Sequence, residues 1–201
     1  MAFITHSSEN RLRRLLLAVL AVILLPGRPA AAESIDVVRN TAVLTAGGQL
    51  DVSSRFQTEL PEQLKQLLKQ GVPLYFTLNY RLSDPTWASY KAKFDQLSGS
   101  GNSIAYKLSF HPLTNRYRVT VGTFSTEYST LETALRGVGA VANWRVLQPG
   151  TLSDVAADEV KAEIRLALST SQLPKPFQIN ALTSKNWQLD SGWKPLGIVK
   201  G

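Results

Sequence analysis

The chain has 201 residues, carries a formal charge of +7 and contains no cysteine. The absence of cysteine excludes disulfides, thiolate metal sites, iron–sulfur clusters and cysteine nucleophiles. The length suits one domain with one hydrophobic core, which packing alone must stabilise.

The first 32 residues have the pattern of a secretory signal peptide. An apolar run, "LLLAVLAVILL" at 15–25, is followed by "AAA" at 30–32, where small residues allow cleavage before Glu33. We therefore expect residues 1–32 to be a signal peptide and residues 33–201 to be the mature protein, located in the periplasm. The positive charges ahead of the apolar run are Arg11, Arg13 and Arg14.

An uncleaved membrane anchor is the alternative for this segment. A membrane-spanning helix needs ~20 apolar residues, and Arg28 interrupts any extension of the run, so we expect no transmembrane span after cleavage. Removal of four arginines and one glutamate with residues 1–32 lowers the formal charge from +7 to +4. Nucleic acid is therefore not an expected partner.

The first half of the mature chain alternates strands and one helix. Residues 34–56 predict two strands joined at Gly47-Gly48. Apolar residues at helical spacing predict a helix at about 59–70, and the apolar run "VPLYFTLNYRL" at 72–82 predicts a buried strand. Period-2 alternation predicts further strands at 104–110 and 117–121. The segment Thr86–Leu97 fits either a strand or a helix.

The second half predicts one more helix and one long strand. "STLE" at 129–132 is a capping box, with Ser129 as the N-cap of a helix that buries Leu131, Leu135, Val138 and Val141. Gly137 and Gly139 weaken that helix, which indicates a packing reason for small residues. Residues 160–168 alternate as a strand, and "LPKPFQI" at 173–179 is expected to be extended. The pattern as a whole predicts an α+β domain: a mainly antiparallel, meander-like sheet with two α-helices packed on it.

Candidate catalytic residues are scarce. His111 lies in "LSFHPLTNRYRV", where "HPLTN" is a turn sequence between two strands. A metal site usually needs several His or Cys ligands, and a catalytic histidine needs a nucleophile and a carboxylate close to it. We therefore expect His111 to have a structural role. The acidic residues of 154–163 are interpreted as a solvated loop and not as a glycosidase pair. No catalytic residue, metal or cofactor is predicted.

A cationic face is the most informative chemical feature. On the expected meander, five basic side chains project from the face opposite the apolar one, and only Asp95 opposes them. Lysines on strands can simply discourage edge-to-edge aggregation. The alternative is a docking face for an acidic protein surface or an anionic envelope lipid. The candidate residues are Lys91, Lys93, Lys107, Arg116 and Arg118.

Five segments in a fixed order resemble a known family. They are "GVPLYFTLNYRL", "YKLSFHPLTNRYRV", "STLETAL", "LPKPFQINAL" and "WQLDSGW", and together they cover nearly the whole mature chain. The chain resembles the bacterial family catalogued as domain of unknown function 4390 (DUF4390). The resemblance implies an exported proteobacterial protein without an established biochemical activity, with members encoded near a membrane sensor kinase. Here "LSDPTWASYKAKFDQL" keeps Trp87 but loses most of the family's Arg- and Trp-rich stretch after the buried strand.

Together these patterns predict a cofactor-free envelope protein that binds a partner and is not an enzyme. The alternative is a cofactor-free hydrolase whose serine and aspartate residues are not recognisable from sequence. A deep pocket with convergent polar groups would favour the hydrolase, and an exposed charged or apolar face would favour the binding module.

Overall fold

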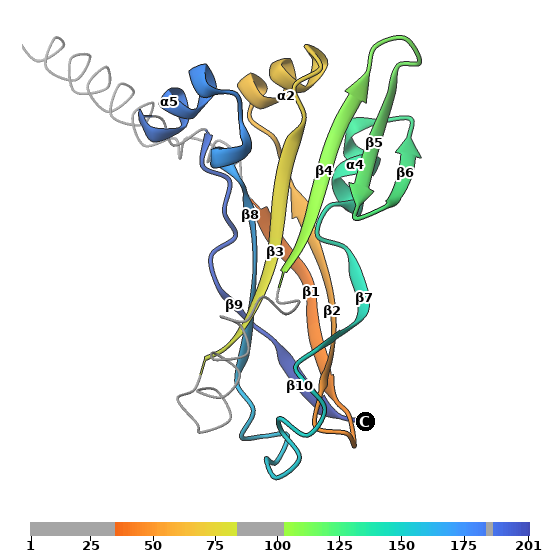
Figure 1. The fold of residues 1–201 in the computed structure, drawn as a ribbon, viewed down its shortest axis with the longest axis vertical. Helices are drawn as coiled ribbons and strands as arrows, with labels where there is room; N and C mark the ends of the chain where they lie inside the picture. The colour runs from red at the N-terminus through yellow and green to blue at the C-terminus, as the bar shows by residue number, and fades with distance from the viewer. Residues whose placement is uncertain (1–34, 84–102, 184–186) are drawn as a thin grey trace, which may run out of the picture. The chain divides into compact units, whose positions relative to one another are not determined.

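This computed structural model describes residues 35–83, 103–183 and 187–201, all within the unit Glu33–Gly201. Two sheets carry the fold (Figure 1). The larger sheet has the strand order β6-β5-β4-β3-β8-β9, and the smaller has the order β10-β1-β2-β7. Strands of the larger sheet are β3 (Leu74–Leu82), β4 (Ser103–His111), β5 (Arg116–Val121), β6 (Phe124–Tyr128), β8 (Ala162–Leu168) and β9 (Lys194–Pro195). Strands of the smaller sheet are β1 (Ile35–Leu44), β2 (Leu50–Thr58), β7 (Val141–Val146) and β10 (Gly197–Lys200).

Strand pairing is antiparallel throughout the larger sheet and between β1, β2 and β7. The one parallel pair that the described ranges contain joins β1 to β10 near the C-terminus. The predicted α+β class with mainly antiparallel pairing is therefore confirmed. The single meander-like sheet is corrected to two sheets, because β1, β2 and β7 pair with one another and not with β3.

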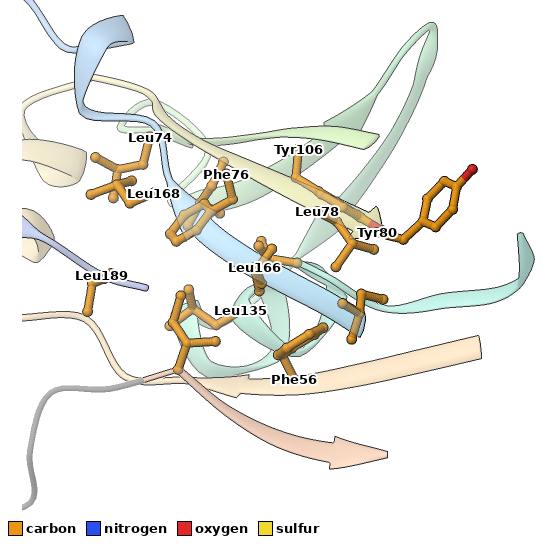
Figure 2. Packing of buried hydrophobic residues seen from close by; sticks show 14 of the residues in the cluster. Phe56, Leu74, Phe76, Leu78, Tyr80, Tyr106, Leu135, Leu166, Leu168 and Leu189 are labelled. Atoms are coloured by element: carbon orange, nitrogen blue, oxygen red, sulfur yellow. The ribbon is translucent and has the colours of Figure 1, made fainter. Parts of the chain in front are cut away.

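The hydrophobic core lies between the inner faces of the two sheets. Each strand buries alternate residues, as the period of two requires. Figure 2 shows side chains of β3 and β8, among them Phe76 and Leu166, meeting Phe56 of β2. All three are almost completely buried. Alternation in β2, β3 and β8 thus produces one shared core.

The connection between α4 (Leu131–Gly137) and β7 ties the two sheets together. The Ser54 hydroxyl of β2 donates a hydrogen bond to the carbonyl of Gly139 at 3.1 Å. The Tyr106 hydroxyl of β4 donates to the carbonyl of Ala140, also at 3.1 Å. A Cβ atom on Gly139 would lie 2.6 Å from Leu166 Cδ2, and one on Gly137 would lie 2.6 Å from the Tyr128 hydroxyl. The predicted packing reason for both glycines is confirmed.

The prediction of two helices undercounts the structure. The described chain contains three α-helices: α2 (Glu62–Lys69), α4 and α5 (Lys175–Thr183), with a short 3₁₀ helix at Thr170–Gln172. The extended conformation predicted for 173–179 is wrong. Pro176 falls in the first turn of α5, where a helix loses no backbone hydrogen bond to proline. No helix among the described residues is long and apolar enough to cross a membrane.

The helix α4 begins one residue later than the capping box predicted. Thr130, not Ser129, is the N-cap, and its hydroxyl accepts a hydrogen bond from the Thr133 amide at 3.2 Å. Glu132 instead pairs with Arg136 one turn along the helix. Val141 was placed in the helix by its spacing but lies in β7. Tertiary pairing of β7 with β2 overrides the helical pattern there.

Candidate functional site

The β4–β5 hairpin places three of the five predicted cationic residues on one face. Strand register pairs His111 with Arg116, Ser109 with Arg118, and Lys107 with Thr120. Directly opposed residues lie on the same face of a sheet. Their sequence neighbours on β4 and β5 point to the core, and Leu108 and Val119 are buried. Lys107, Arg116 and Arg118 therefore share the outer face of the larger sheet.

The two remaining predicted residues, Lys91 and Lys93, lie outside the described residues, as does Asp95. The structure adds an acidic neighbour that sequence alone did not place. Strand β6 was not predicted, and its register pairs Glu127 with Arg118. The Arg118 guanidinium donates to the Glu127 carboxylate at 2.5 Å and holds the pKa of that carboxyl below its usual value.

Some basic side chains of this outer face form ion pairs, and others do not. Arg118 has Glu127, and the neighbouring strands carry two further pairs, Arg81 with Glu163 and Arg165 with Asp190. Lys107 and Arg116 form no ion pair in the described part of the chain, although the charge of Arg116 also acts on Glu127. The Lys107 ammonium lies 5.9 Å from the Tyr75 ring. The β4–β5 hairpin thus carries basic side chains of this face that are in no ion pair.

A hollow with a volume of about 410 Å³ opens on the same hairpin. Lys107, Ser109 and His111 line it from β4, and Arg118 and Thr120 line it from β5. Ser125 of β6 and the loop between α2 and β3, at Gly71 and Pro73, complete its wall. Cationic groups and hydroxyls therefore surround one concave space, which is a suitable arrangement for an anion with several oxygen atoms.

His111 ends β4, and the turn follows at 112–115. Asn115 closes the turn with a φ of 51°, a conformation that asparagine tolerates better than most residues. The predicted hairpin is confirmed, with His111 as a strand residue beside the turn. Its Nε2 atom is buried and has no hydrogen-bond partner in the described structure. Buried polar atoms are rarely left unpaired in folded proteins, so this nitrogen is an exception among them.

The other half of the outer face has a different character, because its charges are paired. The Arg81 guanidinium lies 4.2 Å from the centre of the Trp193 ring, and that of Arg165 lies 5.8 Å from it. The guanidinium of Arg165 also holds the pKa of Asp190 below its usual value through their hydrogen bonds. This cluster closes the C-terminal segment onto β3 and β8. Trp187 lies outside this cluster: it is buried, and its ring is stacked on that of Phe177.

No metal site is seen in the described ranges, where no group of three or more His, Asp or Glu side chains is close enough to hold an ion. No match was found among curated proteins. No solved structure matches either. A comparison with protein families matches residues 32–196 to the domain of unknown function DUF4390. That match spans most of the chain and agrees with the resemblance of its five segments, and on this basis the chain belongs to the DUF4390 family.

Proposed function

We propose that this protein is an exported, non-catalytic binding module of the cell envelope that holds an anionic partner on the outer face of its larger sheet. One observation carries the proposal. Lys107 and Arg116 form no ion pair within the described residues, and they lie on the same face as the hollow lined by Lys107, His111 and Arg118.

Charge alone does not single out this face. Arg39 and Arg55 oppose each other on the outer face of the smaller sheet and are also exposed. What distinguishes the β4–β5 hairpin is the combination of cations, hydroxyls and a concave surface. One basic side chain near an anionic surface gains about 1 kcal/mol, so useful attraction requires several of them. Such attraction weakens as salt screens it.

The hydrolase alternative has less support. A serine hydrolase needs a histidine whose ring nitrogen accepts the proton of a nearby hydroxyl. The Nε2 atom of His111, the sole histidine of the described chain, has no such partner. Binding therefore explains the described groups around the hollow better than acyl transfer does.

The test is a pair of matched charge reversals. Lys107→Glu with Arg116→Glu should reduce binding to anionic partners at least about tenfold at low salt, because several favourable contacts become repulsive. Arg39→Glu with Arg55→Glu makes the same change of net charge on the smaller sheet and should leave binding unaltered. Sedimentation with phosphatidylglycerol vesicles tests a lipid partner, and capture from solubilised envelope with mass spectrometry tests an acidic protein. Equal losses for the two double variants would refute the assignment of the face.

Export is the second part of the proposal, and it rests on the signal-peptide pattern of residues 1–32. N-terminal sequencing of protein from the periplasmic fraction should find a start at or near Glu33. An intact Met1 in the membrane fraction would contradict it. Because the family resemblance brings an association with a membrane sensor kinase, the periplasmic part of such a kinase is the first protein partner to test.

A further inference from the structure

A second concave site lies away from the cationic face and shares no lining residue with it. Its volume is about 390 Å³, and it lies where the end of β2 meets α2 and α4. Leu60, Leu131 and Leu135 supply its apolar walls, and Thr58 and Glu59 line it from the end of β2. Pockets for small ligands have this character, mostly apolar with a few polar groups, and this volume is near the lower end of their range of roughly 300–1,000 Å³.

The Thr58 hydroxyl is the first sign that the pocket is incomplete. Thr58 is only 6 % exposed, and its oxygen is buried without a hydrogen-bond partner in the described structure. No protein group of the described structure satisfies this atom, which makes it costly to keep. Rotation about χ1 moves the hydroxyl of a threonine to another staggered position, which the methyl group or the Cβ hydrogen held before. Since the Thr58 side chain lines the pocket, its hydroxyl can form a hydrogen bond with a ligand there after this rotation.

The second sign is the charge at the rim. Two of the charged lining residues are already in ion pairs, Lys65 with Glu62 at 3.5 Å and Glu132 with Arg136. Glu59 is exposed and has no ion-pair partner among the described residues. The rim and its paired neighbours together carry three carboxylates and two cations, an excess of one negative charge. An anionic ligand is therefore disfavoured, and a cationic one is attracted.

We propose that this pocket binds a small cationic amphiphile, namely a short alkyl or aryl group that carries a primary ammonium. The apolar group lies against Leu60, Leu131 and Leu135. The ammonium donates hydrogen bonds to the Thr58 hydroxyl and the Glu59 carboxylate, so that the buried hydroxyl gains the partner it lacks. The inference does not depend on the anionic partner of the larger sheet, because the two sites share no residue.

Hexylammonium and hexanoate are suitable probes, since they differ in charge but hardly in apolar length. Titration calorimetry with the purified protein should show saturable binding of hexylammonium and none of hexanoate. Glu59→Gln should weaken hexylammonium binding about threefold, as loss of an exposed charge pair does. Thr58→Val should weaken it about fivefold, the loss expected for one hydrogen bond. Thr77→Val, on the outer face of β3, is the matched control and should bind as the parent does.

The same valine variant tests the unpartnered hydroxyl directly. Without ligand, Thr58→Val should raise the midpoint of thermal unfolding by about 2–4 °C, because a methyl group replaces a buried hydroxyl that has no partner. The proposal is overturned if hexylammonium does not bind, if hexanoate binds equally well, or if Thr58→Val binds hexylammonium like the parent. A lower midpoint for that variant also overturns it, since the hydroxyl would then have a stabilising partner.

Discussion

Replacement of Gly139 by alanine tests how the two sheets are joined. Gly139 lies between α4 and β7 with a φ of +75°, in the left-handed region that residues with a Cβ atom avoid. A Cβ atom there would lie 2.6 Å from Leu166 Cδ2 and 3.0 Å from Phe56 Cδ2. Both side chains are almost fully buried, so neither can move aside without disturbing its own neighbours. A backbone shift that relieved the contact would also strain the hydrogen bond from Ser54 to the Gly139 carbonyl.

Two costs add for Gly139→Ala. The left-handed conformation costs a residue with a Cβ atom about 1–2 kcal/mol. Insertion of a methyl group into a filled core costs a further ~1–3 kcal/mol. We therefore expect the free energy of unfolding to fall by roughly 2–5 kcal/mol, a large part of the total stability of an ordinary domain. The midpoint of thermal unfolding should fall by about 2–4 °C for each kcal/mol lost.

Gly71→Ala is the matched control. Gly71 has a φ of +88°, but a Cβ atom there would meet nothing within 4 Å. The free energy of unfolding of this variant should fall by only about 1–2 kcal/mol, which is the cost of the left-handed conformation. Urea unfolding of both variants, followed by circular dichroism, measures the difference between them. If the two variants lose equal stability, the contacts with Leu166 and Phe56 contribute nothing and the packing argument is refuted.

Three further predictions concern titration and the candidate site. Burial raises the pKa of Tyr80 and of Tyr106 to about 12, above the unfolded value of ~10. The free energy of unfolding that these neutral phenols contribute is therefore fully present below pH ~10 and should be lost as pH rises towards ~12. A free energy of unfolding in urea that stays constant across this range would contradict the prediction. The hydrogen bonds from Arg165 lower the pKa of Asp190 in the folded protein. The stabilisation of the fold by this ion pair is therefore present above pH ~4 and is lost as pH falls through the pKa that Asp190 has in the folded state. Arg165→Met should lower the free energy of unfolding at pH 7 by at most ~1 kcal/mol and flatten its acid dependence, and an unchanged acid dependence would exclude this pair as its source. His111→Asn should change the free energy of unfolding by less than ~1 kcal/mol in thermal melts, and a larger loss would show that the imidazole ring supports the hairpin.

Local pattern was sufficient to predict much of the sheet. The strands β1 to β5 and β8 follow from apolar alternation or apolar runs, because a side-chain period of two identifies the buried face without knowledge of the partner strand. The same alternation predicts that Lys107, Arg116 and Arg118 share one face, and the register of β4 with β5 is consistent with this for these three residues. Family membership also followed from sequence, because it depends on the residues themselves.

Long-range pairing decided the rest. Strand β6 has exposed residues nearly throughout and therefore no apolar alternation, so its place beside β5, and with it the ion pair between Glu127 and Arg118, could not be predicted. Thr58 and Glu59 are ordinary residues at the end of a strand until α2 and α4 pack around them and form a pocket. Alternation says which side of a strand is buried, but not which strand lies next to it. Partner strands, counter-ions and pockets depend on contacts between residues far apart in the chain, and only the tertiary structure determines those.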